Sequence, residues 1–198
     1  MVAKFVGSRT ENNLFAAFVG ESQARNRYSF AASFFASGRL KVLEKLFLFV
    51  ADQEKQHAKI FYNFLSSFGS DREINIEGAS YPVDVLNNSV GIFEKSQRNE
   101  LVEHELYKEF GEEARYEGFS EISKKFLEIS EIEKSHGERF GEFAGLLRGN
   151  ELFACKSGNS CWLCLECGKI YNGCQAPQEC PVCGHPFGYF LKKDLSLL

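Results

Sequence analysis

Two copies of a Glu-x-x-His pattern, Glu54 with His57 and Glu133 with His136, are the residues of this sequence best suited to metal chemistry. On a helix, side chains three residues apart project from the same face. Each pair also interrupts a stripe of apolar residues that recur every three or four positions, which is typical of the buried face of a helix. Because an unpaired carboxylate is costly to bury, a bound cation is the simplest compensation.

Glutamates interrupt the apolar stripes of two further helical stretches, at Glu21 in the first and at Glu100 and Glu103 in the third. A single Glu on such a stripe lies more often at the edge of a core, and a single buried His is more often just hydrogen-bonded. The duplicated pattern favours a two-metal site instead, with oxygen-rich ligation that suits iron or manganese better than structural zinc. We expect seven side chains to meet at one level of a bundle: Glu21, Glu54, His57, Glu100, Glu103, Glu133 and His136.

A second metal site is predicted near the C-terminus, where Cys164-x-x-Cys167 and Cys180-x-x-Cys183 are each followed by glycine. Each pair with its glycine predicts a knuckle whose backbone N–H groups point at the sulfurs. Four such thiolates would hold one metal tetrahedrally, although spacing alone does not distinguish zinc from a single iron.

Three cysteines, Cys155, Cys161 and Cys174, remain outside this pattern and are expected to be small, partly exposed thiols, with Cys161 a minor competitor for a ligand position. The odd total of seven argues against a purely disulfide framework, and in a reducing cytoplasm metal thiolates are favoured instead. No apolar run is long enough to span a membrane, and residues 1–8 are too short and interrupted for a signal peptide, so we expect a cytoplasmic protein. The net charge of −4 gives no reason to expect binding to nucleic acid or to an anionic membrane.

The elements that must position these residues are four helices, predicted at about residues 12–37, 39–68, 83–117 and 120–148, with Ser120 as the N-cap of the last. The long connection from Gly69 to Pro82 permits a crossover along the bundle, as in ferritin-like topology. The cysteines begin only after this helical region. We therefore expect an all-α ferritin-like four-helix bundle over residues 1–149, followed by a small metal-bound β/loop domain over residues 150–198 that is too small to fold without its metal.

The chain resembles the rubrerythrin family over essentially its whole length, most clearly in residues 20–28, residues 51–58 and the tail from 164 to 190. The resemblance implies a di-iron bundle joined to a rubredoxin-like domain with one four-cysteine iron, hence three iron ions per chain. In the family pattern the seven carboxylate and histidine side chains match the di-iron ligands, and the rubredoxin-type ligands match Cys164, Cys167, Cys180 and Cys183.

The roles of the di-iron ligands follow from the same hypothesis. Glu54 and Glu133 would bridge the two irons, Glu21 and Glu100 would be terminal ligands, and the histidines would supply nitrogen. Glu103 would be the adjustable ligand, bound in the ferric state and exchanged for His57 in the ferrous state, as the resemblance suggests. The third helix departs from the family pattern, so Glu105 stays an alternative to Glu103, and His104 is expected at the surface or behind the ligands. Tyr28 and Tyr107 are expected to pack in the core or to bond metal-bound carboxylates.

The resemblance implies peroxide reduction, with hydrogen peroxide as substrate and electrons relayed through the four-cysteine iron. No Gly-x-Gly-x-x-Gly pattern is present, so electrons from NAD(P)H would arrive through a separate reductase or a rubredoxin. By analogy we expect a homodimer in which each tail lies near its neighbour's di-iron site. Two alternatives stay open, a ferroxidase or iron-storage protein and a metal-binding module with a zinc-ribbon tail.

Overall fold

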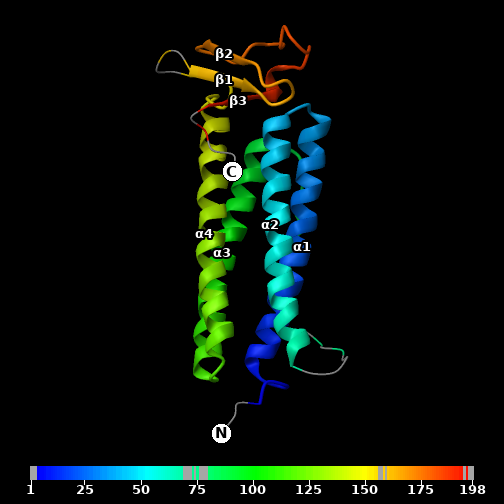
Figure 1. Cartoon of the computed structure of the whole chain (residues 1–198), viewed down its shortest axis with the longest axis vertical. Helices are drawn as coiled ribbons and strands as arrows, with labels where there is room; N and C mark the ends of the chain where they lie inside the picture. The colour runs from blue at the N-terminus through cyan, green and yellow to red at the C-terminus, as the bar shows by residue number, and fades with distance from the viewer. Residues whose placement is uncertain are drawn as a thin grey trace.

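The computed structural model describes residues 4–68, 73, 75, 80–155, 158, 160–193 and 195. Four long helices form a bundle, and a small module sits on one end of it (Figure 1). The helices are α1 (Arg9–Ser37), α2 (Lys41–Ser67), α3 (Ser89–Tyr116) and α4 (Ser120–Arg148). The module contains β1 (Ser160–Cys164), β2 (Ile170–Gly173), the 3-10 helix η1 (Phe187–Tyr189) and β3 (Phe190–Lys192), in an antiparallel sheet of order β2-β1-β3.

The four helices are arranged as two antiparallel hairpins, α1 with α2 and α3 with α4. Because α2 and α3 run in the same direction, the chain between them must return along the bundle (Figure 1). The described part of this crossover lies against α1: the Tyr81 hydroxyl donates to the Ala16 carbonyl at 3.1 Å, and Asp84 pairs with Arg27 at 2.8 Å. Gly69, at which the predicted connection begins, lies outside the described residues.

Two helices, α1 and α3, begin at other residues than predicted, and a side chain caps each of these starts. The first helix begins at Arg9, because the Ser8 hydroxyl accepts the backbone N–H of Glu11 at 3.0 Å. The third helix begins at Ser89 instead of about residue 83, with Asn88 as its N-cap. The prediction of Ser120 as an N-cap is wrong, because Ser120 is the first helical residue of α4 and no side chain caps that end.

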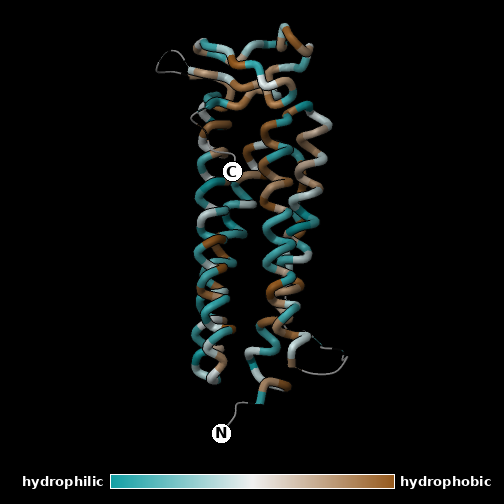
Figure 2. The backbone as a smooth tube through the Cα atoms, viewed as in Figure 1, coloured by the Kyte–Doolittle hydropathy of each residue, from teal (hydrophilic) through white to brown (hydrophobic). Residues whose placement is uncertain are grey.

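The bundle core consists of two apolar clusters with a polar layer between them. The upper cluster, nearer the module, is rich in stacked phenylalanines, and the lower cluster surrounds Phe61 and Phe126. Figure 2 shows hydrophobic and hydrophilic residues alternating along each helix, as expected when one face of each helix is buried. The buried glutamates and histidines that were predicted as metal ligands lie in the layer between the two clusters, with apolar side chains packed above and below them.

The module is docked directly on the turn between α1 and α2 (Figure 1). Leu165 and Leu191 of the module pack against the upper cluster of the bundle, and Phe153 packs against both the bundle and the module core. Gly188 approaches the turn so closely that an added Cβ would lie 2.3 Å from the Arg39 carbonyl oxygen. The position of the module therefore depends on a backbone contact that only glycine allows.

Candidate metal centres

The four helices bring six of the seven predicted bundle residues together in two overlapping groups. Within each group one ligand atom per residue lies within 4.8 Å of all the others, and all six residues are buried. Glu54 and Glu133 belong to both groups, so the two groups describe adjacent positions that share two carboxylates. One group is completed by Glu21 and His57, and the other by Glu100 and His136.

The His57 ring faces three carboxylates through a single atom. Its Nδ1 lies 2.9 Å from Glu133 Oε1, 3.1 Å from Glu54 Oε2 and 3.7 Å from Glu21 Oε2. A ring nitrogen carries at most one proton, so it can donate to only one of these oxygens. A cation among the four atoms would satisfy all of them at once.

The His136 ring repeats this arrangement on the other side. Its Nδ1 lies 3.0 Å from Glu133 Oε2, 3.1 Å from Glu54 Oε1 and 3.3 Å from Glu100 Oε2. The two imidazole rings lie nearly parallel with centroids 5.9 Å apart. Each position thus offers one imidazole nitrogen and several carboxylate oxygens, a donor set that suits iron or manganese.

Gln53 contacts His136 on the side of the ring away from the carboxylates, and the helical periodicity did not predict this contact. Its Oε1 lies 3.0 Å from His136 Nε2, so that nitrogen donates its proton to the amide and Nδ1 is left to face the carboxylates. Among the described residues, no hydrogen bond is made to Nε2 of His57. The only signal in the sequence was the position of Gln53 directly before Glu54, which gives no indication that it faces α4.

Two buried tyrosines orient the carboxylates that are not shared. The Tyr107 hydroxyl donates to Glu21 Oε1 at 2.8 Å, and the Tyr28 hydroxyl donates to Glu100 Oε1. Both rings also pack in the apolar clusters, so they fix the outer ligands to the core. The hydrogen bonds considered for these tyrosines are therefore present.

The electrostatics of the layer indicate a site built for positive charge. Glu21 Oε2, Glu54 Oε1 and Glu133 Oε1 are buried without a well-formed hydrogen bond, which is costly for carboxylates. Burial and the charges of Glu133 and Glu54 raise the pKa of Glu21 well above its usual value, and burial together with the charge of Glu54 raises the pKa of Glu100 to about 8. A cation would compensate both the unpartnered carboxylate oxygens and the mutual repulsion that raises these pKa values, so these residues fit a two-metal centre.

Glu103, the seventh predicted residue, lies outside both groups and is half-buried. Burial and the charge of Glu100 raise its pKa well above the usual value. Glu105, the alternative to Glu103 as a ligand, lies on the outer face of α3. Its side chain is 65% exposed and forms an ion pair with Lys108 at 3.1 Å. His104 is also outside both groups; it is buried, and its Nδ1 lies 2.7 Å from the Ser130 carbonyl oxygen.

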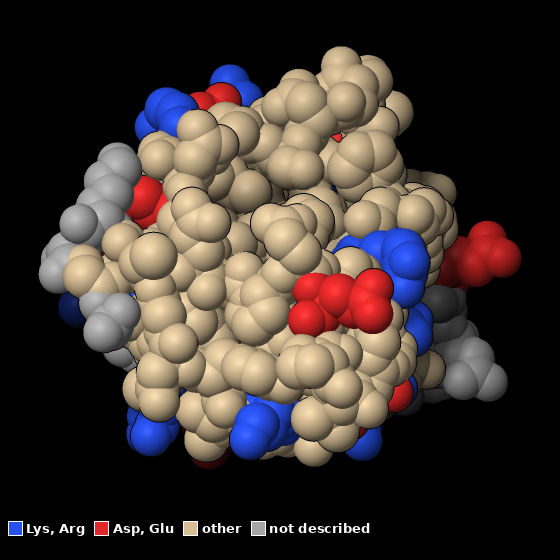
Figure 3. Space-filling view, turned by 90° about the horizontal axis from the view of Figure 1, so that it is seen from above, with Lys and Arg blue, Asp and Glu red and all other residues tan. Residues whose placement is uncertain are grey.

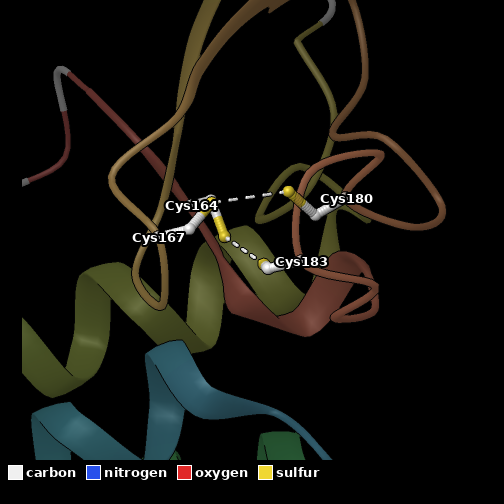
Figure 4. A group of neighbouring side chains, drawn as sticks. All are labelled: Cys164, Cys167, Cys180 and Cys183. Atoms are coloured by element: carbon white, nitrogen blue, oxygen red, sulfur yellow. Dashed lines mark hydrogen bonds between the residues drawn. The ribbon is translucent and has the colours of Figure 1, made fainter.

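The thiolate site is assembled as the spacing predicts. Cys164, Cys167, Cys180 and Cys183 converge, with their sulfurs all within 4.8 Å of one another (Figure 4). The sulfurs of Cys164 and Cys183 are 3.7 Å apart, and those of Cys167 and Cys180 are 3.6 Å apart. Four sulfurs at these separations form a cage for one metal ion.

The first knuckle closes on itself through the backbone. The Cys164 N–H donates to the Lys169 carbonyl at 2.9 Å, and the Gly168 N–H donates to the Cys164 carbonyl at 2.9 Å. Gly168 has φ +76°, a left-handed conformation that glycine adopts without strain.

The second knuckle repeats these bonds, from Cys180 to His185 and from Gly184 to Cys180, both at 2.8 Å. Gly184 has φ +71°. Although burial acts against it, hydrogen bonds from the backbone of Cys183 and Val182 lower the pKa of Cys180 to about 6. The predicted N–H groups therefore do stabilise a thiolate here.

The three remaining cysteines do not join the cage. Cys161 lies on β1 opposite Asn172, and its thiol donates to Asn172 Oδ1 at 3.0 Å. Cys155 is half-buried and Cys174 is exposed.

Comparison with known proteins agrees with this geometry. The family model for rubrerythrin matches residues 12–87 and 91–158, and the model for the rubredoxin-like domain of rubrerythrin matches residues 162–190. This chain belongs to the rubrerythrin family. Rubrerythrin-1 of Clostridium acetobutylicum is 35% identical over 93% of this chain and 94% of its own length, and rubrerythrin of Nitratidesulfovibrio vulgaris is 36% identical over 93% and 94%.

Solved structures of related fold include nigerythrin in a mixed-valence state, with a TM-score of 0.62 at 24% identity, covering 94% of this chain and 86% of that one. The bacterioferritin of Desulfovibrio desulfuricans matches with a TM-score of 0.65 at 19% identity over 72% of this chain and 82% of that one. The predicted ferritin-like fold is thus confirmed.

The rubrerythrin family assignment and the donor sets agree on the cofactors: a di-iron centre in the bundle and a single iron in the four-cysteine site. The described part of the chain contains no helix with the length and apolar character needed to cross a membrane.

Proposed function

We propose that this rubrerythrin family member is a non-haem di-iron peroxidase that reduces hydrogen peroxide to water. One observation carries the proposal: the same chain contains a buried site of carboxylates and imidazoles with room for two metal ions, and a site of four thiolates. The module with the four thiolates is docked on the bundle that contains the carboxylate site. A four-thiolate iron site is typical of electron transfer, because its ligands hold both oxidation states. A storage protein would have no need of such a site.

The ligand roles follow from the two overlapping groups. Glu54 and Glu133, which belong to both, would hold both irons, whereas Glu21 and Glu100, each hydrogen-bonded to a tyrosine, would each hold one. His57 and His136 would supply nitrogen, in each case through the Nδ1 atom that faces the carboxylates. When bound, the iron pair supplies the electrons that break the O–O bond of the peroxide.

The protein excludes water from the ligand layer, holds most ligands rigidly and lets Glu103 and His57 move. The apolar clusters above and below keep bulk water from the ligand layer. Glu103 is the proposed adjustable ligand, because it is half-buried and lies one helical turn from Glu100. His57 Nε2 makes no hydrogen bond in the described part of the chain, so its ring is freer to move than that of His136. This asymmetry supports His57 as the histidine that exchanges with Glu103.

Electrons would enter through the module. Glu54 lies 13 residues beyond Lys41, the first residue of α2, so the ligand layer is about 20 Å below the end on which the module sits. This separation supports a homodimer in which the module of one chain approaches the di-iron site of its neighbour. Figure 3 shows that few charged residues lie on the module end, and Ile170, Val182 and Phe187 are exposed apolar residues of the module. Such a surface suits an NAD(P)H-dependent reductase or a rubredoxin in the cytoplasm as electron donor.

Metal analysis and rapid kinetics would test the proposal. We expect three irons per chain, visible ferric-thiolate absorption, and peroxide consumption by the reduced protein in stopped-flow mixing. Glu54→Ala should abolish this consumption, because both metal positions share Glu54, and Asp52→Ala, an exposed carboxylate on the same helix, should not. Intact turnover in Glu54→Ala would overturn the di-iron mechanism. Zinc in place of iron in the module would overturn the electron relay, and iron oxidation without peroxide turnover would favour a ferroxidase.

A further inference from the structure

Two cysteines that neither metal site uses face each other in the module. Ala154 and Gln175 form an antiparallel bridge, and in that register the adjacent pair is Cys155 with Cys174. The Cys155 N–H donates to the Cys174 carbonyl at 2.7 Å, which fixes these two residues opposite each other.

The backbone spacing suits a disulfide. Directly opposed residues of an antiparallel pair have Cα atoms about 4.5–5.5 Å apart and side chains on the same face. Disulfides span Cα distances of about 4.4–6.8 Å. A second bond, from the Ala176 N–H to the Phe153 carbonyl at 3.0 Å, holds the two segments in this register. The two sulfurs can therefore be joined by side-chain rotation, without rearrangement of the backbone.

The two thiols differ in exposure in a way that suggests an order of reaction. Cys174 is exposed, whereas Cys155 is half-buried. An accessible thiol with a second thiol opposite it is the arrangement of peroxide-sensitive pairs, in which the first is oxidised and the second resolves it. Cys161 differs, because its partner across the sheet is Asn172 and its thiol is hydrogen-bonded to that side chain.

We propose that Cys155 and Cys174 form a redox-active pair that a peroxide oxidises to a disulfide. The Cys174 sulfur attacks one peroxide oxygen, the O–O bond breaks, and one water leaves as a sulfenic acid forms on Cys174. The Cys155 sulfur then attacks Cys174, the S–O bond breaks, and a second water leaves as the S–S bond forms. The two thiols lose two electrons and two protons, and the peroxide becomes two waters. This reaction goes beyond the proposed function because its electrons come from sulfur.

Peptide mapping of the full-length, metal-loaded protein would test this pair. After a small excess of hydrogen peroxide, remaining thiols are alkylated and the protein is digested with trypsin without reduction. Cys155 lies on the tryptic peptide 149–156 and Cys174 on the peptide 170–192. We expect these peptides to appear cross-linked, lighter by two hydrogen atoms than their sum, and to separate on addition of dithiothreitol.

Variants locate the bond, because the peptide 170–192 also contains Cys180 and Cys183. Cys155→Ser and Cys174→Ser should each abolish the cross-link, and the matched control Cys161→Ser should retain it. The cross-link should also form in Glu54→Ala, so failure of the di-iron mechanism would not remove it. Three outcomes would overturn the proposal: a cross-link that persists in Cys174→Ser, a cross-link to the peptide 157–169 that contains Cys161, or oxidation of Cys174 to a sulfinic acid without a cross-link.

Discussion

The carboxylate site draws its ligands from four helices between Glu21 and His136, whereas the thiolate site draws its ligands from two knuckles between Cys164 and Cys183. The carboxylate site lies between two apolar clusters that hold the helices together above and below it. The thiolate site borders one small cluster around Trp162, and Cys167 is exposed. From this difference we expect only one site to depend on its metal for folding: the apolar core should hold the bundle together, whereas the module should need its metal to fold.

Removal of metal should have the largest effect, because it should unfold the module and leave the bundle folded. Trp162, the only tryptophan, is fully buried in the module, so its fluorescence reports on the module alone. With a strong chelator we expect its emission to shift to the red while the helical circular dichroism of the bundle is largely retained. Metal binding contributes on the order of 10 kcal/mol to the folding of such small thiolate domains. A bundle that unfolds together with the module would contradict this division.

Loading the bundle with metal should release protons. Burial raises the pKa of Glu100 to about 8, so this carboxyl holds a proton at pH 7, and burial shifts the pKa of Glu21 in the same direction. A metal ion must displace the proton on Glu100, and its affinity should therefore fall as the pH falls from 8 to 6. Titration of Fe²⁺ or Mn²⁺ into the metal-free bundle site in weak buffer with a pH indicator would measure the release. Metal affinity that is independent of pH would be inconsistent with these raised pKa values.

Loss of the hydrogen bond between His136 and Gln53 should weaken metal binding measurably, but less than loss of a ligand would. Gln53→Leu removes the acceptor that fixes the His136 tautomer, and we expect a loss of about 10–100-fold in metal affinity. Competition with a chelator would measure the loss, and Gln56→Leu, an exposed glutamine on the same helix, is the matched control. An equal effect of both variants would assign the loss to the helix and not to His136.

The smallest expected effect is at the lower end of the bundle, far from both metal sites. Glu117 caps the start of α1, with Oε1 accepting the Arg9 N–H at 3.1 Å and Oε2 accepting the Thr10 N–H at 2.8 Å. Glu117→Gln should cost about 1 kcal/mol of stability, as loss of a helix cap does.

This contribution should depend on pH in a defined direction. Although burial opposes it, hydrogen bonds from Thr10 lower the pKa of Glu117, so the stabilisation is present at pH 7 and is lost as the pH falls through that lowered pKa. Urea unfolding at pH 7 and at about pH 3 would measure this change. Glu109→Gln, exposed on α3, should have no comparable effect at either pH.

Periodicity predicted the helices and the inward direction of Glu54, His57, Glu133 and His136, because burial repeats with the helical period. It placed the start of the third helix too early, at about Val83, although Val83 and Val85 are exposed in the crossover and α3 begins at Ser89. Helix ends depend on single capping side chains, which periodicity does not report.

What the sequence did not reveal depends on contacts between distant segments. The contact of Gln53 with His136 requires knowing how α2 faces α4. The pairing of Cys155 with Cys174 requires a sheet register, which the three intervening cysteines leave open in the sequence. The position of Glu103 outside the two ligand groups also depends on how the helices are packed.

The contact of Gly188 with the Arg39 carbonyl has a consequence for electron flow in the proposed relay. The position of the module on its own bundle, and with it the distance from this module to the neighbouring chain's di-iron site in the proposed homodimer, depends on one residue that has no side chain. Alanine at this position would push the module away from the bundle while leaving all metal ligands in place. A substitution of one hydrogen by one methyl group would thus alter the rate of electron delivery without altering either metal centre.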